Sequence, residues 1–464
     1  MRSSVRLITS ALVLVSAVGN PVVLFSAQQG AGQVDEARRL LVEASHLVKD
    51  LPEDQQPSAV ANIAGQLTRA ADLPDALATI RLLKKKDDQA RATGSISWQL
   101  AHAGNSIQAL ALVDSIDDVQ IKDANYETLA VLLAQQGELA RALQIAHRRK
   151  DSFGVAYTLV LIANQRARVK DLSGAREALS EAIDISNQGV EEDPARVTFL
   201  TQIAATQAKI GDLGAAFRTV DQFSAIAHQY KGPQGKGLLL QSLASTQAQI
   251  GDVVGAQRTV AEIPSGDNSD LALMAISEEQ AKHGLMKDAL ETAGLVSNRA
   301  FKSSTLRQIV IARGTHGTLH DAHEAIDLMS EPAERAETIA TLALEQAVNE
   351  NTSASATLQS ASELTTATAS HASGRTLEFI AVTQAVLGDF AGAQQIVQNM
   401  AEPKSRVWPL WNITSLLAEA GRTEEALALA ESQDSTYPKA YSLLGTAQGI
   451  LIRVEAEREA ARKQ

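Results

Sequence analysis

The chain has 464 residues, of which 45% are hydrophobic but only 3% are aromatic, and its formal net charge is −12. A core with so few aromatic rings must be built from Ala, Leu, Ile and Val, which favours closely packed helices. The absence of cysteine excludes disulfides and thiolate metal sites. Because clustered Lys and Arg supply most of the affinity for a phosphate backbone, the acidic balance predicts no nucleic acid partner.

Residues 1–27 have the pattern of an export signal. Arg2 and Arg6 precede an uncharged apolar run that starts at Leu7, and small residues such as Ala27 offer cleavage points. The apolar run is long enough that an uncleaved membrane anchor over residues 7–27 is the alternative. In both cases the arginines favour the cytoplasmic side. We therefore expect the rest of the chain to be exported, either periplasmic or secreted, with the membrane as a partner only through an uncleaved segment.

One pattern recurs over residues 33–438: a turn residue, usually Gly, is followed five positions later by Ala. Successive turns are 33 residues apart in six of eleven intervals and 34 to 41 apart in the others. A period in this range is typical of stacked helical repeats, in which each repeat contacts only its neighbours. The clear copies have their turns at Gly104, Gly137, Gly211, Gly251, Gly284, Gly317, Gly388 and Gly421, and the weaker ones at Gly32, Ala71, Lys170 and Asn351.

The positions around each turn predict two helices that meet there. Ile or Leu stands eight positions before the turn in every copy from Ile63 to Ile413, which is helical spacing. Gly at the turn can take the left-handed conformation that closes a helix. Asp212, Asp252 and Asp389 follow the turn directly, where a carboxylate can accept hydrogen bonds from the first amides of the second helix.

The clearest copy is Leu200-x2-Ile203-Ala204-x2-Gln207-Ala208-x2-Gly211-Asp212-x3-Ala216. In this pattern the chain resembles the tetratricopeptide repeat family over about residues 33–435. The resemblance implies an all-α, right-handed α-solenoid of about eleven helix-turn-helix repeats. Two departures stand out. The aromatic residue early in the first helix is replaced by Leu, as at Leu200, and survives as Tyr126; the later one is mostly replaced, by Gln at Gln207, Gln247 and Gln384.

The end of the chain is expected to cap the stack. Residues 439–464 begin like another first helix, but no turn follows, so they predict a C-terminal capping helix. The segment Arg453–Gln464 is highly charged, as the solvent-facing side of a terminal cap would be.

No residue pattern indicates catalysis, a cofactor or a metal. The chain contains neither a phosphate-binding loop nor a nucleophile elbow, and its acidic pairs fall in loops or on exposed helix faces, so we do not expect an enzyme. His316, His320 and His323 are the one cluster of histidines. Their spacing differs from the known zinc-helix motif, and we interpret them as solvated side chains near a turn.

The residues proposed to bind a partner come from the resemblance. In tetratricopeptide repeats the first helices line the concave groove, and the frame carried over to this chain implies that six large side chains lie on that surface: Arg91, Trp98, Tyr157, Arg307, Trp408 and Trp411. Trp, Tyr and Arg are the usual carriers of binding energy at interfaces. For Trp408 and Trp411 the alternative is that they pack against the terminal helix; Pro409 between them is expected in the first turn of its helix.

The sequence therefore predicts an exported scaffold that binds a protein or peptide partner in the concave groove. The alternatives are a cell-envelope accessory factor that binds a carbohydrate or other ligand with the groove aromatics, and a purely structural spacer.

Overall fold

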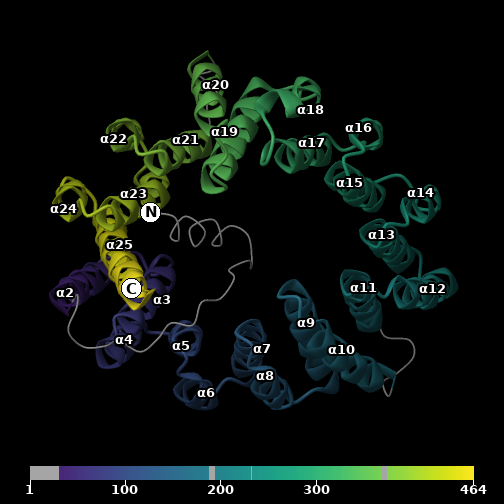
Figure 1. Ribbon diagram of the computed structural model, residues 1–464, viewed down its shortest axis with the longest axis horizontal. Coiled ribbons are helices and arrows are strands. Elements are labelled where there is room, and N and C mark those ends of the chain that lie inside the picture. The colour runs from purple at the N-terminus through teal and green to yellow at the C-terminus, as the bar shows by residue number, and fades with distance from the viewer. Residues whose placement is uncertain (1–30, 188–193, 231, 368–373, 464) are drawn as a thin grey trace. The chain divides into compact units, whose positions relative to one another are not determined.

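The computed structural model describes residues 31–187, 194–230, 232–367 and 374–463 (Figure 1). Throughout these ranges the regular elements are helices, which confirms the predicted all-α solenoid. The expected export signal at residues 1–27 lies outside the described ranges. None of the described helices combines the length and the apolar character needed to cross a membrane.

The helices form two compact units, and unit 1 contains both ends of the chain, up to residue 136 and from residue 358 onward. Its helices are α2 (Ala31–Val48), α3 (Gln56–Arg69), α4 (Leu73–Ile80), α5 (Lys86–His102), α6 (Ser106–Asp114), α7 (Val119–Gln135), α21 (Gly374–Val386), α22 (Phe390–Asn399), α23 (Pro403–Glu419), α24 (Thr423–Glu431) and α25 (Thr436–Lys463).

Unit 2 covers residues 137–357. Its helices are α8 (Leu139–Ala146), α9 (Ser152–Arg168), α10 (Leu172–Asn187), α11 (Pro194–Lys209), α12 (Leu213–Gln229), α13 (Pro233–Gln249), α14 (Val253–Ala261), α15 (Asp267–Lys282), α16 (Met286–Gly294), α17 (Arg299–Gly314), the 3₁₀ helix η1 (Leu319–Ala322), α18 (His323–Asp327), α19 (Pro332–Val348) and the start of α20 (Ala354–Ala367). From α3 and α4 to α23 and α24, each first helix is followed by a second helix, and η1 and α18 together take that place after α17. The second helix is the shorter one in every pair except α11 and α12.

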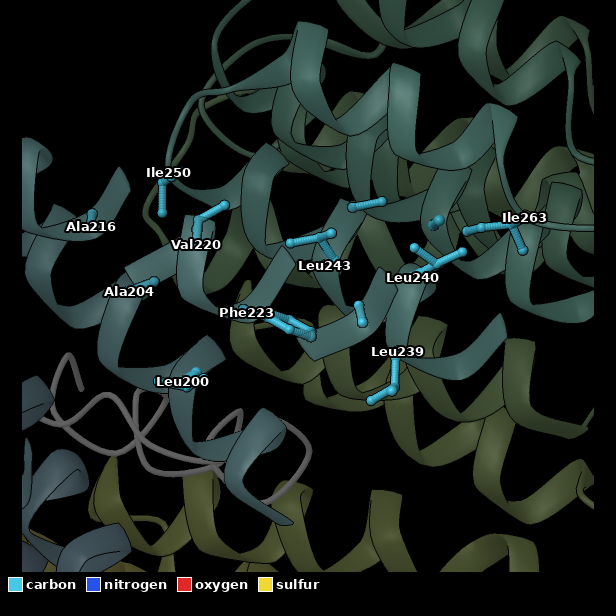
Figure 2. Close-up of a cluster of buried hydrophobic side chains, with 13 residues drawn as sticks. Leu200, Ala204, Ala216, Val220, Phe223, Leu239, Leu240, Leu243, Ile250 and Ile263 are labelled. Atoms are coloured by element: carbon cyan, nitrogen blue, oxygen red, sulfur yellow. The ribbon is translucent and has the colours of Figure 1, made fainter. Parts of the chain in front are cut away.

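The repeated apolar positions form the core between the two helices of each repeat. The Ile or Leu eight positions before the turn is at most 2% exposed in all eleven copies, and the Ala five positions after the turn is at most 1% exposed in the eight clear copies. Figure 2 shows that in unit 2 the core continues from one repeat to the next, because Leu240 and Leu243 of α13 lie with Phe223 of α12 in one buried cluster. The side chain at the Ala position must be small because two backbones approach each other there.

Glycine closes most first helices in the left-handed conformation, as predicted. Seven turn glycines have φ between 79° and 93°, which glycine adopts without a steric penalty. In one of these copies the amide of Asp212 donates to the carbonyl of Gln207 at 2.9 Å, which closes the turn. The predicted caps are also confirmed: Asp212, Asp252 and Asp389 each accept a hydrogen bond from the amide three residues on, at 2.9 to 3.0 Å.

Three turns use another residue in the same conformation, namely Ala71, Lys170 and Glu350, with φ of 60°, 63° and 58°. The ninth turn is therefore centred on Glu350, not on Asn351 as the sequence analysis assumed. The sequence could not show this shift, because neither residue type marks a left-handed position as clearly as glycine does.

The turn at Gly317 also differs from the prediction, since Gly317 does not have a positive φ. Here α17 ends at Gly314, and side chains of the next repeat hold the irregular loop. Gln346 Nε2 donates to the carbonyl of Gly314 at 2.6 Å, and Asn351 Nδ2 donates to the carbonyl of Gly317 at 2.7 Å. These contacts replace the hydrogen bonds that a regular helix closure would supply.

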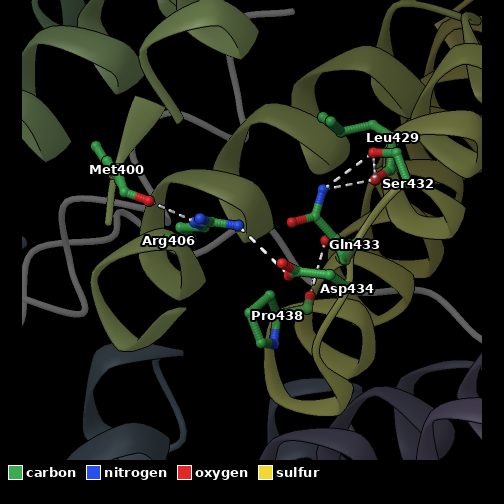
Figure 3. A network of polar contacts seen from close by, with 8 residues as sticks. Met400, Arg406, Leu429, Ser432, Gln433, Asp434 and Pro438 are labelled. Atoms are coloured by element: carbon green, nitrogen blue, oxygen red, sulfur yellow. Dashed lines mark hydrogen bonds and ion pairs between the residues drawn. The ribbon is translucent and has the colours of Figure 1, made fainter. Parts of the chain in front are cut away.

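Arginine side chains tie two of the first helices, α19 and α23, to the loops before them. In α23, Arg406 Nε donates to the carbonyl of Met400 at 2.8 Å, and its Nη1 lies 3.4 Å from Oδ1 of Asp434 (Figure 3). Arg335 makes the corresponding contact with the carbonyl of Met329 in unit 2, at 2.6 Å. In both contacts the acceptor is the main-chain carbonyl of a buried methionine.

The long helix α25 brings the two ends of the chain together within unit 1. It packs on α23 and α24, which precede it, and on α2 and α3 from the start of the chain (Figure 1). Gly32 is a helical residue of α2 and not the turn that the sequence predicted. α2 nevertheless buries Ala37 as a second helix does, and α25 continues the series of first helices. The two helices therefore form one further pair, built from opposite ends of the sequence.

Two glycines allow α25 to lie directly on the backbone of α23. A Cβ atom at Gly445 would lie 2.3 Å from the carbonyl oxygen of Trp411, and one at Gly449 would lie 2.1 Å from that of Ser415. Both distances are far below van der Waals contact, so no other residue fits without displacement of a helix.

Part of the segment that was expected to face solvent is instead an interface. Glu455 of α25 forms a bidentate ion pair with Arg69 of α3, in which Arg69 Nε lies 2.8 Å from Glu455 Oε1. Arg453 Nη1 donates to the carbonyl of Ala418 at 3.0 Å, and Val454 is buried. The expectation for Arg453–Gln464 is therefore wrong at its first three residues, because the ends of the chain meet there.

Candidate functional site

The first helices of three consecutive repeats in unit 1 enclose a hollow of about 400 Å³. It lies on the face of α3, α5 and α7 that is turned away from their second helices, since the residues of α5 that pack on α6, such as Ser97, lie on the opposite side. The lining residues are Ala61, Asn62, Gly65 and Gln66 of α3, Arg91, Gly94, Ser95, Trp98 and Gln99 of α5, and Asn125 and Thr128 of α7. Arg91 and Trp98, two of the predicted partner-binding residues, thus share one site.

Trp98 forms an aromatic wall of the hollow. Its ring stacks on the ring of His102, one helical turn later, with centroids 5.0 Å apart and planes at 8°. Trp98 is half-buried. The stack covers one face of the indole and holds the ring in place beside the hollow.

His102, which stacks on Trp98, is also affected by the charges of the ion pair between Arg69 and Glu455. Burial lowers the pKa of His102 below its ordinary value, the positive charge of Arg69 lowers it further, and Glu455 opposes the shift. The imidazole is therefore neutral near pH 7. Its buried Nδ1 has no hydrogen-bond partner.

The polar groups of the hollow are mainly primary amides. Gln66 Oε1 is buried and accepts no hydrogen bond. Asn125 Nδ2 donates to the carbonyl of Ile121 at 2.8 Å, and its Oδ1 lies against Gly94, 2.0 Å from where a Cβ atom would be. Asn62 and Gln99 add two further amides. Such groups offer both donors and acceptors and carry no charge.

Arg91 is the one charged side chain in the lining. Its Nη1 lies 3.2 Å from Oδ1 of Asp88, and its side chain is 66% exposed. The guanidinium therefore lies at an exposed edge of the site and is already paired, so its electrostatic attraction for a ligand is weak.

The tryptophans of α23 each contact a neighbouring helix. Trp411 Nε1 donates to Oε1 of Gln448 at 2.8 Å, and its ring meets Tyr441 edge to face with centroids 5.7 Å apart. Trp408 meets Phe379 in the same way, also at 5.7 Å. Trp411 thus packs on the terminal helix, which was the alternative interpretation of this pair, whereas Trp408 packs on α21.

The position of Pro409 was predicted wrongly. Helix α23 starts at Pro403, so Pro409 lies in its interior and not in its first turn. Pro403 occupies the favourable first turn instead. The buried residues Val407 and Leu410 on either side hold the helix across Pro409.

The two remaining predicted residues, Tyr157 and Arg307, lie in unit 2, and each contacts another side chain. Tyr157 of α9 stacks on Phe153 with centroids 6.4 Å apart. Arg307 of α17 lies 3.2 Å from Glu337 of α19, and Ser303 Oγ, one turn earlier, donates to Glu334 of α19 at 2.8 Å. Arg307 therefore contributes to the contact between α17 and α19.

The histidine cluster does not form a metal site in the described ranges, where no group of His, Asp and Glu is arranged to hold an ion. The rings of His320 and His323 stack with centroids 4.6 Å apart, and His323 Nδ1 lies 2.6 Å from the carbonyl of His320.

The sequence analysis missed the amides and glycines of the hollow. Gly65 and Gly94 carried a signal, because both interrupt a predicted first helix where glycine is unfavourable. Asn62, Gln66 and Asn125 carried none, since polar residues on a helix are common and only the juxtaposition of α3, α5 and α7 gives them a shared environment.

Comparisons with known proteins extend to the architecture alone. The sequence matches no protein-family model and no curated protein. Among solved structures, Ton1535 from Thermococcus onnurineus is 17% identical with a TM-score of 0.31, over 76% of this chain and 99% of that one. The pentatricopeptide repeat protein PPR10, solved in complex with an 18-nt psaJ RNA element, is 14% identical with a TM-score of 0.30, over 92% of this chain and 68% of that one.

The prediction that nucleic acid is excluded as a partner is corrected by this comparison. PPR10 is a pentatricopeptide repeat protein, and its structure was solved in complex with an RNA element. Net charge was too coarse a criterion, because it says nothing about how charges are distributed on one face. At this low similarity the comparison does not identify what the present chain binds.

Proposed function

We propose that the protein is a non-catalytic helical-repeat scaffold that binds a protein or peptide partner in the hollow of α3, α5 and α7. The observation that carries this proposal is the convergence of Trp98, Arg91 and four primary amides from three helices on one hollow of about 400 Å³. A concave site with an aromatic wall and a few convergent polar groups is the usual form of a binding site. Its lining has no Asp, Glu, His, Lys or Cys, so it lacks the usual acids and bases of catalysis.

Affinity capture tests this proposal. The full chain and its Trp98→Ala and Arg91→Ala variants are used to recover partners from extracts of the source cells, with Arg81→Ala as a control at an exposed arginine outside the hollow. We expect Trp98→Ala to abolish recovery of a partner that Arg81→Ala retains. Equal recovery by every variant would contradict the proposal and favour a structural spacer.

We also propose that the protein is exported. The support is the sequence of residues 1–27, and the first described helix begins only at Ala31, so removal of these residues leaves every described helix intact. Expression of the full chain in a Gram-negative host, followed by N-terminal sequencing of the periplasmic fraction, tests this. A mature chain that begins at Gln28 is expected. Full-length protein in the membrane fraction would indicate the anchor, and full-length cytoplasmic protein would contradict export.

A further inference from the structure

We infer that the hollow of α3, α5 and α7 recognises an extended peptide segment through its main-chain amide groups. This inference rests on the proposed function and adds the chemistry of the ligand. It follows from three features of the site: a buried acceptor without a donor, a lining of neutral amides, and a glycine that the packing of the chain does not require.

The acceptor is Oε1 of Gln66. It is buried and has no hydrogen-bond partner, although buried polar atoms in folded proteins are almost always paired. The oxygen belongs to a residue that lines the hollow, so a ligand in the hollow can supply the missing donor. A peptide N–H is such a donor, and it is present at nearly every position of an extended chain.

The remaining polar groups match a neutral, hydrogen-bonding ligand. Asn62 and Gln99 each carry a donor and an acceptor, and the amide of Asn125 is oriented by its bond to the carbonyl of Ile121. A side-chain amide can pair with a peptide group through both of its polar atoms. Because these amides come from three adjacent helices, a ligand that crosses the helices meets them one after another.

Gly65 lines the hollow at a position where the packing of the chain allows a larger residue. A Cβ atom at this position would meet only Gln99, with its Cγ 3.6 Å away, which is ordinary contact. The packing of α3 against α5 therefore accepts a larger residue, and glycine weakens a helix relative to alanine. Gly94 differs, because a Cβ atom there would lie 2.0 Å from Oδ1 of Asn125. Gly65 is thus a residue of the lining that the packing of the helices does not require to be glycine, with the side chain of Gln99 as its neighbour.

A saccharide fits the site less well. Sugar rings pack their apolar faces on exposed aromatic faces, and the lining offers a single aromatic ring, Trp98, of which one face is covered by His102. The charged carboxylates that hold sugar hydroxyls in many sites are also absent from the lining.

The test uses random 12-residue peptides displayed on phage and selected on the immobilised full chain. Selected peptides are resynthesised with each amide N-methylated in turn, and their affinities are measured by fluorescence anisotropy. We expect N-methylation at a central position to weaken binding about tenfold or more, as loss of one well-formed hydrogen bond to a buried acceptor would. Gln66→Leu should weaken the parent peptide to a similar extent, with little further loss for the N-methylated peptide.

Gly65→Ala is the matched space-filling variant, and Gly32→Ala, with no atom within 4 Å of the added Cβ, is its control. We expect Gly65→Ala to lower peptide affinity while thermal stability stays the same or rises. The inference is overturned if no peptide is selected, if N-methylation is tolerated throughout, or if chitotetraose binds the hollow and peptides do not. Should Trp98→Ala still abolish partner recovery in those cases, the scaffold function stands and only the peptide chemistry fails. If no hollow variant affects the partner, the proposed function fails as well.

Discussion

The hydroxyl of Thr219 donates to the amide oxygen of Gln207 across the turn of its repeat, at 2.8 Å, and Thr259 does the same to Gln247 at 2.7 Å. These two glutamines occupy the position where the tetratricopeptide pattern has an aromatic ring. The ring is thus replaced by a polar pair that joins the first helix to the second. In α21 and α22 the corresponding position holds Ile396, which has no hydroxyl, and Oε1 of Gln384 is buried without a partner.

Thr219→Val tests this pair. The substitution preserves shape but leaves the amide oxygen of the buried Gln207 unpaired, so we expect the free energy of unfolding of unit 2 to fall by about 1–3 kcal/mol. Amide hydrogen exchange of α11 and α12, read by mass spectrometry, measures the change. Thr352→Val, at an exposed position, should leave exchange unaltered. Equal protection in both variants would show that the pair adds no stability.

His102 makes the stability of unit 1 depend on pH. Its pKa in the folded protein is lowered by burial, then by Arg69, with Glu455 opposing. The unfolded chain therefore binds the proton more readily, and stability is full above the ordinary histidine pKa of about 6.5 and is lost as the pH falls through the folded pKa. We expect His102→Gln to unfold with a smaller difference in midpoint between pH 7 and pH 5 than the wild type. An unchanged difference would exclude His102 as the source.

At the scale of whole helices, two glycines differ in whether the packing of the helices requires them. Gly449 of α25 faces the carbonyl oxygen of Ser415, where a Cβ atom would lie 2.1 Å away. Gly65 of α3 faces the hollow and has room for a methyl group. Both glycines lie within segments that the sequence predicts as helical. The distance from the added Cβ atom to the neighbouring helix is what distinguishes them.

We expect Gly449→Ala to lower the stability of unit 1 by about 1–3 kcal/mol, since the added methyl forces α25 away from α23. Gly65→Ala should raise stability by about 0.5–1 kcal/mol through helix propensity. Tryptophan fluorescence during chemical unfolding measures both, because the three tryptophans of the chain all lie in unit 1. A stable Gly449→Ala variant would disprove the close approach of the two helices.

On the scale of the molecule, α25 and α2 show what the sequence could and could not predict. The repeat period, the buried Ile or Leu and the aspartate caps were readable because they recur in every copy or in several. The pairing of α25 with α2 was not, because a repeat pattern describes neighbours in sequence and these helices lie at opposite ends. The hollow was missed for a related reason: Gln66, Asn125 and Gly65 belong to the positions that do not repeat.

The ion pair between Arg69 and Glu455 tests the joining of the chain ends. Glu455→Gln leaves the largely buried guanidinium without its carboxylate, so we expect unit 1 to lose about 2 kcal/mol of stability. Glu457→Gln is the matched control, because Glu457 is exposed and lies 3.9 Å from Arg453. Denaturant midpoints by tryptophan fluorescence compare the two. Indistinguishable midpoints would mean that this contact does not hold the ends together.

The central claim is that a partner binds in the hollow of α3, α5 and α7, and site-specific photocrosslinking tests it most directly. A photoreactive phenylalanine analogue replaces Ser95 inside the hollow or Ile107 on α6, which is 76% exposed and lies outside it. The captured partner is then irradiated with each variant. We predict a crosslinked product from position 95 and none from position 107. A product from position 107 alone would contradict the claim.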